Sequence, residues 1–250
     1  MASMGKLSAY LRNETPFVAI YHVPEAPEGS ESPDESIHCV FKSMFIPALK
    51  GHTIAARKDQ MGCGGSHNGL GMGGESDRKD LSFIYSTGLN DRPGAGFYRD
   101  PEIASASLGF MKAYGTGNDY CVMEPLDKAE SRGAPIEVVA ILTDNVRISA
   151  LSTLIGYDRA PGPHVHMVHA FACEELYALP KAESEKGTQD AFLGATELYV
   201  RKFVRPEEMT FAVPYEAYKR MESNADKTFL ANGRWEKALG DLQENHSCCM

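Results

Sequence analysis

The segment Ile136-Glu137-Val138-Val139-Ala140-Ile141-Leu142 carries the chain's clearest signal of a buried β-strand. Its aliphatic residues, several of them β-branched, form a short continuous run of the kind that buried strands have. Thr143-Asp144-Asn145 can then cap a helix over Val146–Ile155, which Gly156 would end. A strand that leads directly into a helix indicates an α/β or α+β fold.

A similar order of elements occurs earlier in the chain. The first half reads as strand Phe17–Ile20, helix 39–49, Gly51, strand 52–56 and Cys63. The second half reads as strand Val138–Ile141, helix 145–155, Gly156, strand 164–172 and Cys173. This order predicts two pseudo-repeated halves, residues 1–134 and 135–250, each a small sheet with covering helices, which share a cleft within one compact domain. Residue identity between the halves is weak, so chance similarity is the alternative.

The remaining apolar runs predict further elements. Strands are expected over 81–85, 120–123, 197–200 and 211–215. Asp100-Pro101-Glu102 opens a helix because proline and acidic residues favour the first helical turn. Pro47 is expected to end or kink the helix over 39–49, and Trp235 to lie on a packing helix near the end of the chain.

Composition and charge narrow the class of protein. The chain has 250 residues, of which 43% are hydrophobic and 24% charged, as in ordinary globular proteins. The net charge of −9 argues against a nucleic-acid partner, because such proteins usually present a basic face. No apolar run approaches the roughly 20 residues that cross a bilayer, and the first residues do not resemble a signal peptide. We therefore expect a cytoplasmic protein without a membrane partner.

The six cysteines exclude two common kinds of site. They are too few for a disulfide scaffold, and none belongs to a Cys-x-x-Cys pair. A zinc ribbon and a thioredoxin-type site are therefore not indicated.

A glycine-rich loop surrounds one of these cysteines, and it reads Met61-Gly62-Cys63-Gly64-Gly65-Ser66-His67-Asn68-Gly69-Leu70-Gly71-Met72-Gly73-Gly74. Successive amides in such a loop form an anion-binding nest, which would use Gly64, Gly65, Ser66 and Asn68. The loop lacks the lysine of a nucleotide P-loop, and it matches the dinucleotide fingerprint in letters only, without the strand and helix around it. The alternative is a purely structural loop.

A histidine run, His164-Val165-His166-Met167-Val168-His169, is the most unusual local feature. In a strand, His164 and His166 point to one face, where both could bind a metal or an anionic ligand. The alternative is a polar strand face whose imidazoles are already hydrogen-bonded. The acidic pair Glu174-Glu175 follows the run and would be stabilised by a helix start.

The chain resembles the domain-of-unknown-function 169 (DUF169) family over residues 14–222. The resemblance rests on Cys63-Gly64-Gly65 with Gly69-Leu70-Gly71, on the strand and helix before Cys173, and on Val213-Pro214-Tyr215-Glu216. It implies three cysteines at set places, matched by Cys39, Cys63 and Cys173, and a source among anaerobic bacteria or archaea. Some members carry a further cysteine near the final strands, where this chain has Phe192–Thr196. The family supplies no established activity.

These features predict a protein that binds a transition metal or an iron–sulfur cluster beside a small-molecule pocket, with a possible redox role. Soft thiolates favour such groups, so Cys39, Cys63 and Cys173 are the expected ligands. His67, four residues after Cys63, is the nearest candidate for a fourth contact, and His164 and His166 are the others. The alternatives are a metal-free binding protein for an anionic metabolite and an accessory subunit of a larger complex. A homo-oligomer is possible, and no nucleophile–base pair specifies a reaction.

Overall fold

The computed structural model describes residues 5–33, 37–62, 64–72, 79–110, 116–168 and 171–248. In this part of the chain one mixed sheet has the order β2-β5-β1-β6-β9-β8-β7, in which all neighbours are antiparallel except β7 and β8. The mixed α/β class predicted from the sequence is confirmed. The strands of the sheet are β1 (Val18–Val23), β2 (Ile54–Arg57), β5 (Tyr120–Pro125), β6 (Val138–Asp144), β7 (Val165–Met167), β8 (Ala191–Gly194) and β9 (Glu208–Pro214).

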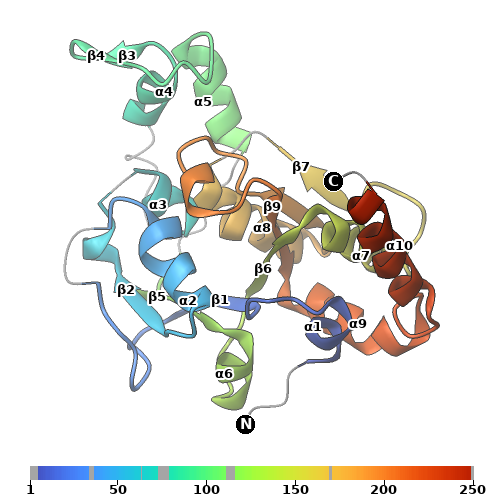
Figure 1. Cartoon of the computed structure of the whole chain (residues 1–250). Helices are drawn as coiled ribbons and strands as arrows, with labels where there is room; N and C mark the ends of the chain where they lie inside the picture. Colours follow the sequence, from blue (N-terminus) through green and yellow to red (C-terminus); the bar gives the residue numbers. More distant parts are fainter. Residues whose placement is uncertain are drawn as a thin grey trace.

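Helices cover both faces of the sheet (Figure 1). One layer, on the face of Val138 and Ala140, contains η1 (Phe41–Phe45), α2 (Ile46–Leu49), α3 (Gly64–Gly69), η4 (Glu174–Ala178) and α8 (Leu179–Lys186). The other layer, on the face of Val139 and Ile141, contains α1 (Lys6–Leu11), α6 (Leu126–Ser131), α7 (Asn145–Ile155), α9 (Tyr215–Asn224) and α10 (Arg234–Cys248). Alternate residues of β6 therefore enter two different apolar clusters, which explains why its sequence is apolar throughout. Short 3₁₀ turns complete the helical elements, namely η2 (Lys58–Gln60), η5 (Arg201–Phe203) and η6 (Ala225–Lys227).

The segment that follows β6 folds as the sequence predicts. The Asp144 carboxylate accepts a hydrogen bond from the backbone N–H of Arg147 at 2.9 Å, which caps α7. Gly156 is the C-cap of the same helix. Trp235 is also confirmed on a packing helix, where it is 4% exposed.

The two prolines of the first layer lie within helices rather than at their ends. Pro47 follows the π-helical turn η1, and Pro180 follows the π-helical turn η4. Proline has no N–H for the normal i→i−4 bond, and a wider turn before the ring accommodates this loss. The helix over 39–49 therefore continues past Pro47 instead of stopping there.

An arm, defined as residues 79–110, projects from the body at the top of Figure 1. Its elements are α4 (Lys79–Tyr85), the hairpin β3 (Gly88–Leu89) and β4 (Arg92–Pro93), and α5 (Pro101–Phe110). The predicted strand over 81–85 is wrong, because α4 buries Leu81 and Ser82 but exposes Phe83 and Ile84. That pattern follows one face of a helix rather than the alternation of a strand.

The predicted strand over 197–200 is also wrong, since this segment forms a turn in which Leu198 is 74% exposed. The strand is β8 instead, which ends at Gly194. A Cβ atom at Gly194 would lie 2.6 Å from Thr210 Oγ1 and 2.7 Å from Glu175 Cβ, so glycine permits this close contact between sheet and helix.

The predicted repeat of two halves is not confirmed. Strands of both halves belong to one sheet, joined where β1 pairs with β6. Outward from this pair the order is β5 then β2 on one side, and β9 then β8 on the other. In this order α2, which precedes β2, corresponds to α8, which precedes β8. The sequence comparison had instead matched the helix over 39–49 to residues 145–155, which form α7.

In the described residues, no helix has both the length and the apolar character needed to cross a bilayer.

Candidate functional site

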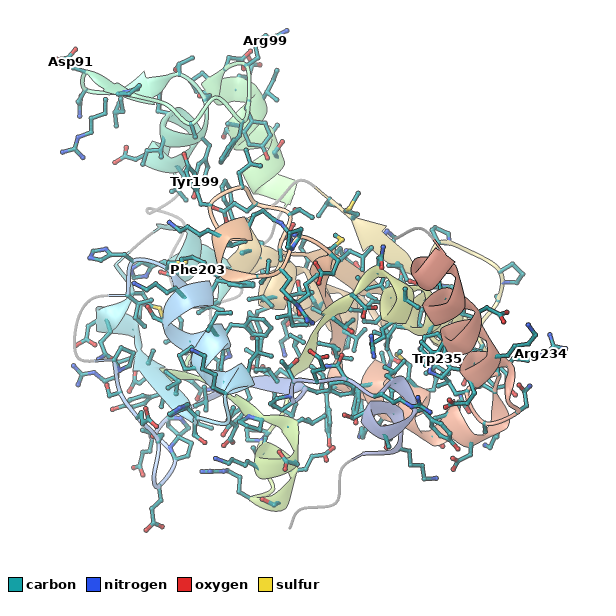
Figure 2. The ribbon with its side chains drawn as sticks, in the orientation of Figure 1. Asp91, Arg99, Tyr199, Phe203, Arg234 and Trp235 are labelled. Atoms are coloured by element: carbon teal, nitrogen blue, oxygen red, sulfur yellow. The ribbon has the colours of Figure 1, made fainter. Side chains whose placement is uncertain are left out.

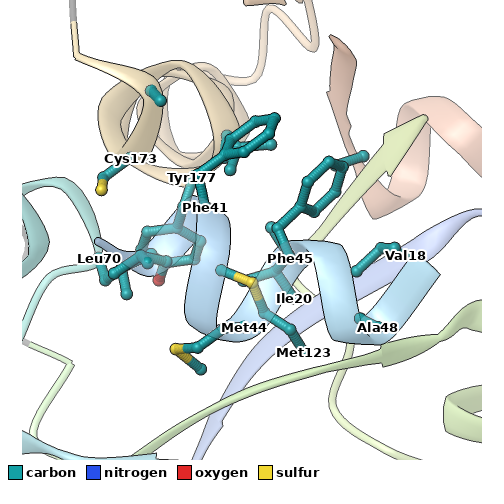
Figure 3. Close-up of a cluster of buried hydrophobic side chains, with 14 of the residues drawn as sticks. Val18, Ile20, Phe41, Met44, Phe45, Ala48, Leu70, Met123, Cys173 and Tyr177 are labelled. Atoms are coloured by element: carbon teal, nitrogen blue, oxygen red, sulfur yellow. The ribbon is translucent and has the colours of Figure 1, made fainter. Parts of the chain in front are cut away.

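Cys39 and Cys173 line one cavity of about 220 Å³, called here the two-thiol cavity. Its walls come from the segments 38–41, 171–173 and 197–200 of the body and from one residue of the arm, Tyr85. Cys173 is 8% exposed and Cys39 is half-buried. Figure 3 shows Cys173 in the buried cluster that also contains Phe41, Leu70 and Tyr177. The fold thus brings together two thiols that are far apart in the sequence.

The segment before α3 is tied by its backbone to the segment before Cys39. The Ile37 N–H donates to Gln60 O at 2.6 Å, and the Gly62 N–H donates to Ile37 O at 2.9 Å. Cys63 itself lies outside the described residues. Its neighbour in the chain, Gly62, is therefore bonded to a residue two positions before Cys39.

The helix α3 packs directly on Cys173. A Cβ atom at Gly69 would lie 2.5 Å from Cys173 Cβ and 2.8 Å from Glu174 N. Glycine is required at this position because no side chain fits between the two backbones. Gly64, Gly65, Ser66 and Asn68 all belong to α3, so the predicted nest is a short helix with Ser66 buried.

His67 is not among the residues that line the two-thiol cavity. It lines another cavity, of about 750 Å³, together with Arg57, Lys58, Asp59 and Tyr120. Its Nδ1 atom is buried and has no hydrogen-bond partner in the part of the chain that the structure describes. The predicted role of His67 as a fourth contact to the thiolate site therefore has no support from the described geometry.

His164 and His166 bind one carboxylate at a different place. His166 Nε2 lies 2.9 Å from Asp190 Oδ2, and His164 Nδ1 lies 3.4 Å from Asp190 Oδ1. Arg159 adds an ion pair to the same carboxylate at 2.6 Å. Burial raises the pKa of Asp190, but the hydrogen bonds from His166 and Arg159 outweigh it and hold the pKa below its usual range. Neither histidine lines the two-thiol cavity, and His169 lies outside the described residues.

Three carboxyl groups gather beside Cys173. Glu197 lines the two-thiol cavity, and its Oε2 atom accepts a hydrogen bond from the Ala172 N–H at 3.1 Å. Glu175 accepts hydrogen bonds from the hydroxyl and the N–H of Thr196, but burial still raises its pKa to about 7. Burial raises the pKa of Glu174 well above its usual range, and Glu174 Oε2 has no hydrogen-bond partner among the described residues. Sequence reasoning noticed Glu174 and Glu175 but missed Glu197, because only the tertiary fold brings Glu197 to the cavity.

A buried network around His22 was also missed. His22 Nδ1 lies 2.7 Å from Glu137 Oε2, and the same carboxylate accepts from Tyr177 OH at 3.2 Å and pairs with Lys181 at 3.0 Å. Cys121 pairs with His22 across the strands β5 and β1. The signal in the sequence was a histidine and a glutamate inside strands that are otherwise apolar, where an unpartnered polar group is costly. This network lines no cavity found in the described residues, and we interpret it as part of the core.

Among the described residues, no three histidine, cysteine, aspartate or glutamate side chains lie close enough to hold one metal ion. The two-thiol cavity is lined by two thiols, by the carboxylate of Glu197 and by the imidazole of His38.

One comparison with known proteins finds a match. A family model, DUF169, described as an uncharacterised ArCR family, matches residues 6–224. No curated protein and no solved structure matches the chain.

Proposed function

The chain belongs to the DUF169 family, and we propose that it binds a transition metal or an iron–sulfur cluster through Cys39, Cys63 and Cys173. The observation that carries this proposal is that Cys39 and Cys173 line one cavity although they are distant in the sequence. Free cysteine is usually an isolated, buried residue, and two of them facing one space need a further reason. Thiolates are the ligands that iron–sulfur clusters, zinc and copper(I) prefer.

The position of Cys63 in the chain supports its inclusion as the third ligand. Gly62 is bonded to Ile37, and α3 begins at Gly64 and packs on Cys173. The chain on both sides of Cys63 therefore lies beside the segments that carry the other two thiols. A cluster holds its protein ligands farther apart than a single ion does, so a cavity between the thiols suits a cluster better than one ion.

The cavity also supports the proposed small-molecule pocket. Three thiolates leave one position of a cubane cluster for another group. Glu197 and His38 line the same cavity and are the protein groups that could fill this position. An exogenous molecule in the cavity could bind there instead, which would allow a redox role. We propose a cytoplasmic location for the protein because reduced thiols persist there.

Metal analysis of anaerobically purified protein tests the proposal. We expect iron, or another soft metal, at a stoichiometric level, with visible absorption if a cluster is present. Cys39→Ser, Cys63→Ser and Cys173→Ser should each lose most of the metal. Cys121→Ser is the matched control, because Cys121 is fully buried but pairs with His22 outside the cavity. Protein that stays metal-free after anaerobic reconstitution with iron and sulfide would contradict the proposal.

A further inference from the structure

A second cavity, of about 320 Å³, is lined by residues of α1, α6 and α9 and by the segment 13–17, and is called here the acidic cavity. It shares no lining residue with the two-thiol cavity. Figure 2 shows the two places at opposite ends of the body, with Tyr199 of the two-thiol cavity beside the arm and α6 at the bottom of the view. We infer that the acidic cavity binds a small aliphatic diamine, a ligand with an alkyl chain and two ammonium groups.

Part of the acidic cavity is apolar and buried. Phe17, Leu126 and Tyr218 line it, and each is almost fully buried. The rings of Phe17 and Tyr218 meet edge to face, with 6.1 Å between their centroids. An alkyl chain that covered these side chains would leave water, and an aromatic face attracts an ammonium group. The volume is within the range of small-molecule sites.

The charged groups of the acidic cavity are carboxylates. Glu14, Asp127 and Glu130 line it, and no lysine, arginine or histidine is among its lining residues in the described chain. Asp127 and Glu130 are three residues apart on α6, so they project from one side of that helix. Glu14 forms an exposed ion pair with Arg205 at 3.2 Å, and Glu130 accepts a hydrogen bond from Tyr215 OH at 3.0 Å. In the described part of the chain, neither Asp127 nor Glu130 has an ion-pair partner.

The lysines nearest to these acids in the chain bind other groups. Lys128 Nζ donates to Gly51 O at 2.6 Å, and Lys6 pairs with Asp226. The cavity therefore presents more negative than positive charge, which favours a cationic ligand.

The placement of the carboxylates favours a diamine over a metal ion. In the residues that the structure describes, no group of three acidic side chains is close enough to hold one metal ion. Glu14 belongs to the segment 13–17, whereas Asp127 and Glu130 belong to α6. A ligand whose two ammonium groups are separated by an alkyl chain can contact carboxylates of both segments.

The segment 13–17 is held in place by hydrogen bonds to other parts of the body. Asn13 Nδ2 donates to Leu142 O at 3.2 Å, and Thr15 Oγ1 donates to the same oxygen at 3.3 Å. The Leu126 N–H donates to Phe17 O at 2.8 Å, which joins this segment to the start of α6. A cavity whose walls are already ordered loses less entropy when a ligand binds.

Isothermal titration calorimetry of the full chain at physiological ionic strength tests the inference. The probes are 1,5-diaminopentane, pentylamine and pentane-1,5-diol, which share one alkyl chain and differ in the number of ammonium groups. We expect saturable binding of one diamine per chain and no binding of the diol. Because Asp127 and Glu130 are exposed, each ammonium contact is weak, and pentylamine should bind about fivefold more weakly than the diamine.

Two double variants test the carboxylates. Asp127→Asn with Glu130→Gln should weaken diamine binding by about tenfold. Glu28→Gln with Asp241→Asn is the matched control, because it removes the same charge from exposed positions outside the cavity. The control should change the affinity by less than about twofold, since distant charges are screened at this ionic strength. Circular dichroism and thermal unfolding check that both variants fold.

The inference is overturned if the diol binds as tightly as the diamine, or if the two double variants bind the diamine equally well. It is also overturned if the wild type shows no saturable binding of the diamine at millimolar concentration. None of these measurements involves the thiols, so their outcome is independent of the metal proposal.

Discussion

Cys173 and Cys121 are both buried, yet their surroundings differ in kind. Cys173 is touched by the backbone of α3 and borders a cavity with a second thiol and a carboxylate. Cys121 is sealed between strands opposite His22, whose imidazole is held by Glu137. Burial alone therefore does not distinguish a thiol that borders a cavity from a thiol of the core. The difference lies in whether the thiol borders open space or lies in a closed core.

Breaking the buried network around His22, which lies opposite Cys121, should give the largest loss of stability. In Glu137→Gln the buried His22 would lose the carboxylate that neutralises its imidazolium, while Lys181 and Tyr177 would lose their shared partner. We expect the free energy of unfolding to fall by about 3 kcal/mol, measured by urea denaturation. Glu216→Gln is the matched control, because its ion pair with Lys219 is exposed, and it should cost less than about 0.5 kcal/mol. If both variants lost the same free energy of unfolding, the interpretation of this network as part of the core would be wrong.

The same network should make the protein less stable both in acid and at alkaline pH. Burial opposes the imidazolium, but the nearby Cys121 and Glu137 favour it and raise the pKa of His22 to about 10. Because this lies above the unfolded value of about 6.5, the contribution of His22 is complete below that pH and is lost as the pH rises towards 10. Burial raises the pKa of Glu137, but His22 and Lys181 outweigh it and lower the pKa, so its contribution is lost in acid.

Thermal unfolding measured across this range should therefore show a maximum between the ordinary carboxyl pKa and about pH 6.5. In Glu137→Gln the melting temperature should depend less on pH, both in acid and at alkaline pH. A wild-type melting temperature that stays constant from neutral pH to pH of about 10 would contradict the assignment of His22 as charged.

A smaller effect is expected from the packing of α3 on Cys173. Gly69→Ala would place a methyl group 2.5 Å from Cys173 Cβ, so α3 or η4 must shift. We expect a loss of about 2 kcal/mol in unfolding free energy, from overpacking. Gly240→Ala, in open space on α10, should instead stabilise the protein by roughly 0.5 kcal/mol. If Gly69→Ala matches this control, α3 does not contact Cys173 as described, and the comparison between the two cysteines weakens.

Local patterns in the sequence predicted much of the fold. The strand β6, the cap at Asp144, the helix α7 and the helix that begins at Pro101 were all recovered. Each is determined by residues within a few positions of one another, through burial, capping or backbone preference. The segments 81–85 and 197–200 were misassigned because a short apolar run suits either a strand or a helix or turn until its neighbours are known.

For the candidate site, the residue types came from the sequence and their grouping came from the fold. Patterns in the sequence marked Cys63, with the glycines around it, and Cys173, and the resemblance to the DUF169 family added Cys39. Only the tertiary structure decided that Cys39 and Cys173 share a cavity, that His67 faces another one, and that Tyr85 and Glu197 join the thiols. The physical reason is that these contacts join segments far apart in the chain, across a sheet whose strand order no local pattern encodes.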